Sequence, residues 1–257
     1  MGGAELRTPA FVVDEGLLKR NLELLADVAR RAGCKILLAQ KAFSMYRCYP
    51  LIRQYLAGST ASGLYEARLG REEFGGEVHV FKPAYTEAEF EALLEVADHF
   101  VFNSPRQVEK YAARARAAGK QVGLRVNPEH STQEGHAIYD PCAPGSRLGT
   151  TLANFDPAQL PLLDGLHMHT LCEQDSDDLE STGQALEAKF GTYLHGLKWL
   201  NLGGGHHITR PGYDVERLVK LVRRLREIYG VEVYLEPGEA VVLNAGFLFS
   251  QVLEVVH

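Results

Sequence analysis

The sequence predicts a closed (β/α)8 TIM barrel, an α/β fold in which eight parallel strands alternate with helices. The length, 257 residues, suits one large barrel or two ordinary domains. Eight short apolar segments recur along the chain, with helical patterns between them. Parallel strands need helical crossovers, and eight such units are what a closed barrel requires. An open doubly wound sheet is the alternative, but such sheets often have fewer strands.

The predicted barrel strands are short apolar runs bounded by polar or turn residues. They are residues 35–39, 59–62, 78–81, 99–102, 121–126, 165–169, 198–202 and 231–235. The helices expected between them have apolar residues every three or four positions. Examples are residues 64–74, 87–97, 107–118, 179–193 and 215–229.

We expect three parts along the chain. Residues 1–34 hold a short strand and a helix that lead into the barrel, and residues 35–240 form the barrel itself. Residues 245–257 are rich in Phe, Leu and Val and look like a strand that leaves the barrel, with nothing after it to pair with. A bare apolar strand is an aggregation risk. We therefore expect residues 241–257 to begin a C-terminal β-sheet domain that is largely absent from this chain.

Composition and charge narrow the classes of partner. The formal net charge of −6 argues against nucleic acid, because phosphate binding needs clustered Lys and Arg. No apolar run approaches the length of a membrane span, and the first ten residues contain no apolar core of a signal peptide. The four cysteines, Cys34, Cys48, Cys142 and Cys172, form no C-x-x-C pair. This pattern is typical of reduced thiols in a cytoplasmic protein.

Two charged residues are expected to meet where the first and last barrel strands end. Chemistry in parallel barrels lies at the C-terminal rim, and these two strands become neighbours when the barrel closes. Lys41 follows the apolar run ILLAQ, and Glu236 follows VEVYL. A half-buried lysine there can form a Schiff base, although a rim lysine in a salt bridge is about as plausible. A carboxylate against a pyridine nitrogen would keep that nitrogen protonated, although solvated rim carboxylates are common.

A triple glycine follows the seventh predicted strand. Gly203, Gly204 and Gly205 allow backbone amides to approach an anion closely, and a helix after them would add a favourable dipole. These features favour a phosphate site. The simpler alternative is a tight turn.

Histidines near the sixth and seventh strands permit two interpretations. His169 could stack on a ring, with His167 packed below it on the same strand. Alternatively, H-x-H could be a metal pair, completed by Cys172, His206 or His207. No H-x-x-x-H or C-x-x-C accompanies this pair, and a metal site would leave Lys41 and the triple glycine unexplained.

An acidic loop lies at the same predicted rim. Residues 173–178 read EQDSDD and precede a helix, where acids are favourable as helix caps. The functional interpretation is a well of negative charge for a cationic substrate, to which Glu239 would add. Glu173, Asp175 and Glu239 are therefore the candidate substrate-binding residues.

Five motifs in order resemble those of the carboxynorspermidine decarboxylases. They are KAFSM at 41–45, YDPCAPGSRLG at 139–149, HTLCEQDSDDLE at 169–180, GGGHHITR at 203–210 and EPGEA at 236–240. The resemblance extends from about Pro9 to the end of the chain. It implies a barrel that uses pyridoxal 5′-phosphate (PLP), in the wider group of alanine racemase and ornithine decarboxylase, with no metal.

The resemblance also implies residue roles. Lys41 would carry PLP and His169 would stack on its ring, and Glu236 would bind the pyridine nitrogen. The phosphate would be held by Gly203, Gly204 and Gly205. Many relatives have arginine where this chain has Glu239, and an acid there suits an amine on the substrate.

The chain departs from the family pattern in two ways. Gln40 stands where an aliphatic residue is expected before the lysine. Members of the family also carry a β domain after the barrel, which supplies a cysteine and an acidic residue, often across a dimer interface, and none of the four cysteines here matches that position. The resemblance thus implies a homodimer, and it implies that residues 1–257 alone lack catalytic residues of that β domain and would be inactive.

The leading functional hypothesis is PLP-dependent decarboxylation of carboxynorspermidine or carboxyspermidine to norspermidine or spermidine. The first alternative is a single-domain PLP-binding barrel without catalysis, which would not need the acidic rim. The second is a zinc-dependent barrel hydrolase that uses His167 and His169.

Overall fold

The computed structural model describes residues 6–134 and 137–256, and its centre is the predicted barrel. The eight barrel strands are hydrogen-bonded in sequence order and close on themselves. They are β2 (Lys35–Ala39), β3 (Gly58–Ala61), β4 (Glu77–Phe81), β5 (His99–Phe102), β6 (Gln121–Arg125), β7 (Gly165–His167), β8 (Trp199–Asn201) and β9 (Glu232–Leu235). All neighbouring pairs are parallel. The predicted fold class is confirmed.

Barrel closure brings the first and last barrel strands together. Lys35 of β2 is opposite Tyr234 of β9, and Ile36 is opposite Leu235. The residues that follow these two strands therefore share one edge of the rim, as expected from the sequence.

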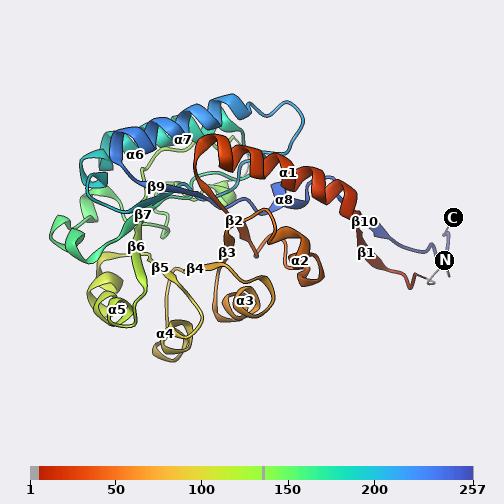
Figure 1. Cartoon of the computed structure of the whole chain (residues 1–257), viewed down its shortest axis with the longest axis horizontal. Helices are drawn as coiled ribbons and strands as arrows, with labels where there is room; N and C mark the ends of the chain where they lie inside the picture. Colours follow the sequence, from red (N-terminus) through yellow and green to blue (C-terminus); the bar gives the residue numbers. More distant parts are fainter. Residues whose placement is uncertain (1–5, 135–136, 257) are drawn as a thin grey trace.

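Helices surround the barrel in a ring (Figure 1). They are α1 (Glu15–Ala32), α2 (Tyr49–Ile52), α3 (Leu64–Leu69), α4 (Glu87–Leu94), α5 (Pro105–Ala117), α6 (Ser176–Leu194), α7 (Val215–Tyr229) and α8 (Glu239–Val242). The connection from β6 to β7 uses the 3-10 turns Leu152–Asn154 and Pro157–Leu162. The expected helix at 64–74 is divided into α3 and the π-helical turn Gly70–Phe74. Glycine is needed at 70 because a Cβ there would lie 2.4 Å from Ser59 Oγ.

The N-terminal helix α1 packs against α7 and β2 and completes the ring. The carboxylate of Asp14 caps its N-terminus by accepting the amides of Gly16 and Leu17, the usual role of Asp at this position. Its inner face buries Leu18, Leu22 and Leu25, at the spacing expected of an amphipathic helix.

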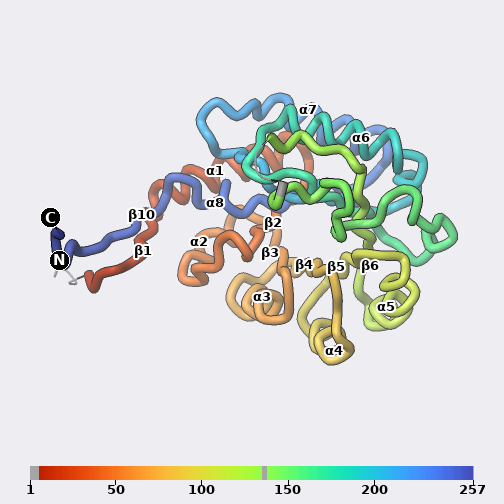
Figure 2. The backbone as a smooth tube through the Cα atoms, turned by 180° about the vertical axis from the view of Figure 1, so that it is seen from behind, coloured from red at the N-terminus to blue at the C-terminus, as the bar shows by residue number. Residues whose placement is uncertain are grey.

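A two-stranded antiparallel ribbon, β1 (Ala10–Val13) with β10 (Gly246–Phe249), extends away from the barrel (Figures 1 and 2). The expectation that the last strand has no partner is therefore wrong. Asn244 has a φ of 56°, and the amide of Asp14 donates to the carbonyl of Ala245, which directs the chain alongside β1. Residues 250–256 form no helix or strand.

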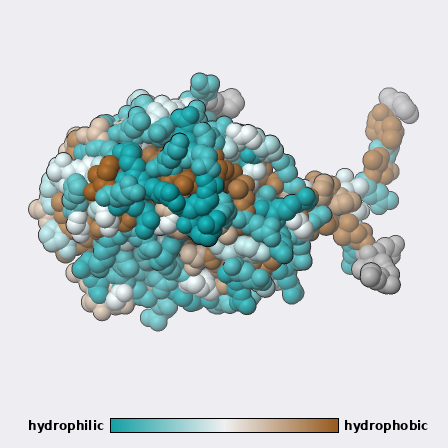
Figure 3. Space-filling view, turned by 45° about the horizontal axis from the view of Figure 1, so that its top comes forward, coloured by the Kyte–Doolittle hydropathy of each residue, from teal (hydrophilic) through white to brown (hydrophobic). Residues whose placement is uncertain are grey.

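The ribbon is strongly apolar and exposed (Figure 3). Phe11 and Leu248 are opposite each other and are 76% and 61% exposed. Single exposed apolar side chains are normal, but a contiguous apolar patch indicates an interaction surface.

A polar cluster fills the N-terminal end of the barrel, far from the C-terminal rim. Glu77 Oε2 lies 3.0 Å from His79 Nε2 and 3.9 Å from His99 Nε2. Lys35 Nζ lies 2.6 Å from Glu77 Oε1, and the Tyr234 hydroxyl donates to Glu77 Oε2 at 3.0 Å. Burial, together with the charge of the nearby His79, lowers the pKa of His99 to about 3. Burial raises the pKa of Glu77, but His79 and Lys35 outweigh it and bring that pKa to about 2.

These shifts predict a loss of stability in acid. The unfolded chain binds a proton on His99 below about pH 6.5, whereas the folded chain resists it down to about pH 3, so stability falls as pH falls through this window. Glu77 adds a loss in the same direction below its ordinary value of about 4.5. We expect His99→Phe to remove about 2 kcal/mol of the decrease in unfolding free energy between pH 7 and pH 5. Urea unfolding at the two pH values measures this difference. An equal decrease in unfolding free energy between pH 7 and pH 5 in His99→Phe and in the unsubstituted protein would contradict it.

Candidate active site

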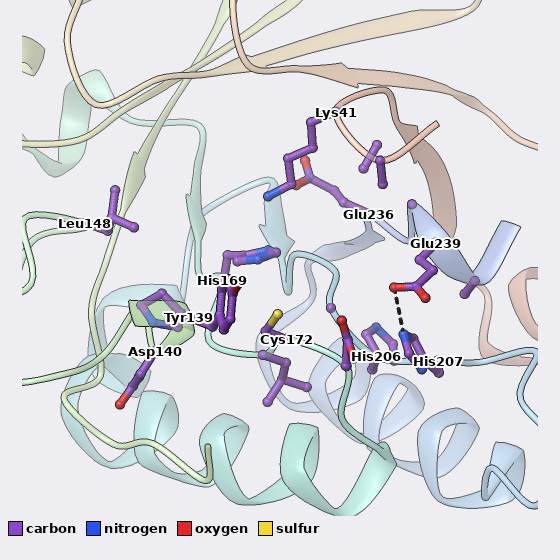
Figure 4. A pocket seen from close by; sticks show the side chains of 18 of the residues that line it. Lys41, Tyr139, Asp140, Leu148, His169, Cys172, His206, His207, Glu236 and Glu239 are labelled. Atoms are coloured by element: carbon purple, nitrogen blue, oxygen red, sulfur yellow. Dashed lines mark hydrogen bonds and ion pairs between the residues drawn. The ribbon is translucent and has the colours of Figure 1, made fainter. Parts of the chain in front are cut away.

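A cavity of about 350 Å³ opens at the C-terminal ends of the barrel strands (Figure 4). Lys41, which follows β2, extends beside Glu236, which follows β9, and both face His169. A smaller cavity of about 210 Å³ lies next to it. The residues that line both are Ala39, Lys41, Arg125, Leu148, His169 and Glu236. The structure thus brings together the three candidate residues from separate strands.

Lys41 is exposed to the cavity rather than half-buried as expected. The preceding residue, Gln40, is buried and points away behind the strand. Its side chain accepts from the Tyr49 hydroxyl at 3.1 Å and donates to the Glu66 carbonyl at 2.9 Å. Gln40 therefore anchors the backbone before Lys41 to the surrounding helices, and this explains a glutamine where an aliphatic residue was expected.

Glu236 is a buried carboxylate with two donors. Asn201 Nδ2 donates to one oxygen at 2.8 Å, and His167 Nε2 lies 3.3 Å from the other. Burial raises the pKa of Glu236, but the contact with His167 and the hydrogen bond from Asn201 bring it well below the usual range. Burial also lowers the pKa of His167. The pair is therefore an ionised carboxylate that accepts from a neutral imidazole.

His169 is held as a neutral imidazole with a defined tautomer. Its Nδ1 accepts the amide of Gly204 at 3.1 Å, so Nε2 is assigned the proton. Burial lowers its pKa well below the ordinary value, and the charges of Lys41 and Arg125 lower it further. This hydrogen bond fixes the orientation of the ring in the cavity.

The glycine run is shaped for close backbone packing. Gly203 and Gly205 have φ values of 70° and 83°, which favour glycine. A Cβ on Gly204 would lie 2.0 Å from the Glu236 carbonyl. The next helix, α7, has the predicted bounds and begins at Val215, ten residues after Gly205, so its N-terminus does not directly follow the run.

Two of the three glycine amides are already engaged. The amide of Gly203 donates to Asn201 Oδ1 at 2.8 Å, and that of Gly204 donates to His169. Within residues 6–134 and 137–256, no acceptor contacts the amides of Gly205 and His206, and both residues line the larger cavity. The side chains of Asn201, which ends β8, and of His169, which follows β7, therefore occupy the amides of the first two glycines.

Arg125 at the end of β6 was not identified from the sequence. It is buried, lies 4.6 Å from the centre of the Phe81 ring, and donates from Nη2 to the His169 carbonyl at 2.9 Å. Burial lowers the pKa of Arg125 to about 10, so it stays a cation at neutral pH. The signal that could have identified Arg125 is a charged residue at the end of an apolar strand, where its side chain reaches the rim.

The acidic loop forms both a helix cap and a cavity wall. Asp175 and Asp178 make a capping box at the start of α6, which confirms the simpler interpretation for these two. Asp175 also makes an ion pair with Arg210 at 2.5 Å, so its charge is already matched. Glu173 is exposed, with a φ of 59°, a conformation that costs free energy outside glycine and often marks a functional site.

A third cavity of about 720 Å³ adjoins the first through Tyr139, Cys172 and Glu173. Its acidic lining is Glu134, Glu173, Asp175, Asp177 and Asp178. Glu239 lies on the first cavity, half-exposed, with Oε2 3.2 Å from His207 Nε2. The negative charge expected at the rim is therefore present.

The predicted zinc ligands do not converge. His167 contacts Glu236, His206 contacts the Tyr213 hydroxyl, and His207 contacts Glu239. Among the described residues, only Glu77, His79 and His99 have the spacing of metal ligands.

This group at the opposite end of the barrel does not suit a metal either. The rings of His79 and His99 are stacked, with centroids 3.8 Å apart and planes at 15°. Their lone pairs therefore run parallel instead of converging on one ion. Lys35 places an ammonium beside the same carboxylate. We assign no metal to this group.

Comparison with known proteins agrees with the barrel geometry. No family model matches the chain. The carboxynorspermidine/carboxyspermidine decarboxylase of Campylobacter jejuni is 40% identical over 253 residues, which cover 98% of this chain and 65% of that protein. The protein of the same name from Herminiimonas arsenicoxydans is 36% identical over 97% of this chain and 68% of its own length. The chain belongs to the carboxynorspermidine/carboxyspermidine decarboxylase family.

Two further comparisons extend this assignment. The carboxyaminopropylagmatine decarboxylase of Synechocystis is 38% identical over 99% of this chain and 66% of its own length. The crystal structure of carboxynorspermidine decarboxylase from Campylobacter jejuni, complexed with norspermidine, superimposes with a TM-score of 0.90 at 39% identity, covering 98% of this chain and 65% of that one. The chain thus spans about two thirds of the length of the curated relatives it matches. No helix among its described residues is long and apolar enough to cross a membrane.

Proposed function

We propose that this barrel binds PLP on Lys41 and decarboxylates a carboxylated polyamine. The observation that carries the proposal is that Lys41 and the buried, ionised Glu236 face one cavity with His169. The family assignment supports decarboxylation over a PLP carrier without catalysis or a zinc hydrolase.

The residues present fit the cofactor at each of its ends. Lys41 offers the amine, and Glu236 offers an anion for the pyridine nitrogen. The phosphate would accept from the backbone amides of Gly205 and His206, with Gly203 and Gly204 shaping the loop that presents them. Bound PLP supplies a protonated ring that accepts the electron pair left when carbon dioxide departs.

The other side chains would prepare the site for that reaction. His169 presents a neutral ring fixed by the Gly204 amide, so it can pack against an aromatic cofactor without adding charge. His167 and Asn201 keep Glu236 ionised. Arg125 holds the backbone of His169 and adds a buried positive charge near the cavity.

We propose a long cationic substrate, because the cavity continues into the acidic third cavity. Carboxynorspermidine and carboxyspermidine, named in two relatives, have this chemistry. Glu239 and Glu173 would contact its amines. Asp175 would contact the substrate together with Arg210, since those two side chains form an ion pair.

We also propose that the β1–β10 ribbon belongs to an assembly surface, and that residues 241–257, with β10, begin a second β-sheet unit after the barrel of residues 35–240. The support is the exposed apolar face of the ribbon with Phe11 and Leu248. A homodimer, as the family resemblance implies, is expected. Sedimentation equilibrium measures it, and a monomer at all accessible concentrations would contradict it.

The functional proposal is tested by carbon dioxide release from the PLP-loaded protein. In protein that also carries the β domain proposed to follow the barrel, we expect turnover with carboxynorspermidine or carboxyspermidine, and slower turnover with carboxyaminopropylagmatine, the substrate named in the third relative. PLP binding without carbon dioxide release from any of the three would favour the PLP carrier and contradict the proposed reaction.

Glu239→Gln is expected to weaken substrate binding more than catalysis. The substitution removes a charge-assisted contact with a substrate amine, so KM for the polyamine substrate should increase at least about tenfold. A matched control is Glu227→Gln on the outer face of α7, which should leave KM unchanged. Equal KM values for Glu239→Gln and the unsubstituted protein would show that Glu239 does not contact substrate.

A further inference from the structure

We propose that Asn201 is a positioning residue that orients the Glu236 carboxylate and decides which glycine amides face the cavity. That the ligand is PLP rests on the proposed function. The hydrogen bonds of Asn201 do not depend on it, and they can be tested in protein without PLP.

Both ends of the Asn201 side chain are engaged, and the side chain is fully buried at the end of β8. Its Oδ1 accepts the amide of Gly203 at 2.8 Å, and its Nδ2 donates to Glu236 Oε1 at 2.8 Å. A backbone N–H can only donate, so Oδ1 must face Gly203. The amide group is therefore fixed in one orientation, and its Nδ2 must face an acceptor.

This orientation favours an ionised carboxylate at Glu236. Nδ2 of Asn201 donates to Oε1, and Nε2 of His167 lies 3.3 Å from Oε2, where the tautomer protonated at Nε2 donates as well. Buried acceptors with two donors favour the charged form. Asn201 achieves this without adding a charge of its own, which leaves the full negative charge of Glu236 available to a ligand.

The same side chain acts on the glycine run. By accepting the Gly203 amide, Asn201 turns that amide away from the cavity, and His169 does the same for Gly204. The amides of Gly205 and His206 remain to bind an anion. Asn201 thus links the carboxylate end of the site to its anion-binding end through one rigid side chain.

The decisive variants are Asn201→Asp, Glu236→Gln and the two together. Asn201→Asp keeps the shape and the acceptor for Gly203 but brings a second carboxylate against Glu236. Two carboxylates at hydrogen-bond distance cannot both ionise freely. The pair therefore holds one proton between them. In the double variant the introduced amide at 236 can donate to the introduced carboxylate at 201, so the hydrogen bond between these two residues is restored with donor and acceptor exchanged, while the carboxylate at 201 still accepts the Gly203 amide.

In protein without PLP, we expect Asn201→Asp to lower the Tm by about 4 °C or more at pH 8 and to recover much of it at pH 5.5, where the pair binds a proton. The double variant should lose less than the sum of the single losses at pH 8. The charge-matched control Asn154→Asp, on an exposed turn, should show neither effect. A Tm difference between Asn201→Asp and the unsubstituted protein that is the same at pH 8 and pH 5.5, or strictly additive losses in the double variant, would overturn the proposal.

PLP binding provides the second readout. The double variant keeps the hydrogen bond at Gly203 and restores the one between residues 201 and 236, so we expect its PLP dissociation constant to stay within about tenfold of the original. Its negative charge has moved from residue 236 to residue 201, so the pH dependence of the bound PLP absorption should shift. An unchanged pH dependence of this absorption would contradict the proposed role of Asn201 in orienting the Glu236 carboxylate. Failure of the unsubstituted protein to bind PLP would instead contradict the proposed function and leave the stability results valid.

Discussion

Lys41→Ala is expected to reduce turnover by about 10³-fold or more, because the proposed covalent attachment of PLP is lost. Lys41 is the lysine that lines both cavities at the rim. The substitution removes an exposed side chain that packs little, so the Tm should change by no more than a few degrees. Steady-state carbon dioxide release measures the effect.

Lys82→Ala is the matched control for that measurement. Lys82 also directly follows a barrel strand, β4, but it makes an ion pair with Glu89 and lines neither cavity at Lys41. Its substitution should leave turnover within about twofold. Comparable losses in the two variants would show that Lys41 has no special role.

Glu236→Gln is expected to lower kcat by about 10²–10³-fold, the range found when one preorganised electrostatic contact is removed from an active site. The amide keeps the size of the side chain but no longer favours a protonated pyridine nitrogen. The loss should appear in kcat more than in KM, because the charge matters most as the electron pair develops.

The control for Glu236→Gln lies on the same strand. Glu232 begins β9 at the opposite end of the barrel, where its carboxylate contacts Lys35 at 3.0 Å. Glu232→Gln should therefore leave kcat unchanged. An unchanged kcat in Glu236→Gln itself would remove the carboxylate from the mechanism.

The sequence predicted the barrel well because its strands carry a strong local signal. β2 and β5 have the predicted bounds, and so does α7. The pairing of β10 with β1 was missed, because ribbon formation depends on the Asn244 turn and the contact between Asp14 and Ala245 rather than on local pattern. Periodicity also could not reveal the π-helical turn Gly70–Phe74 that follows α3.

The sequence predicted that the rim residues lie close together, but it did not predict which hydrogen bonds they form. Lys41 and Glu236 could be paired by topology alone, since the first and last strands of a barrel are neighbours. Asn201 gave no signal, because it stands inside an apolar strand and its role depends on two contacts from other residues, Gly203 and Glu236. Similarly, the pairing of Asp175 with Arg210 joins residues 35 positions apart and has no local pattern.

Reduction by borohydride followed by peptide mass mapping tests the central claim most directly. If PLP is attached to Lys41, treatment of the PLP-loaded protein should add one reduced cofactor to the peptide that contains Lys41. The same treatment of Lys41→Ala should leave the protein unlabelled. Cofactor fixed on any other lysine, or retained covalently in Lys41→Ala, would contradict the assignment on which the proposed function rests.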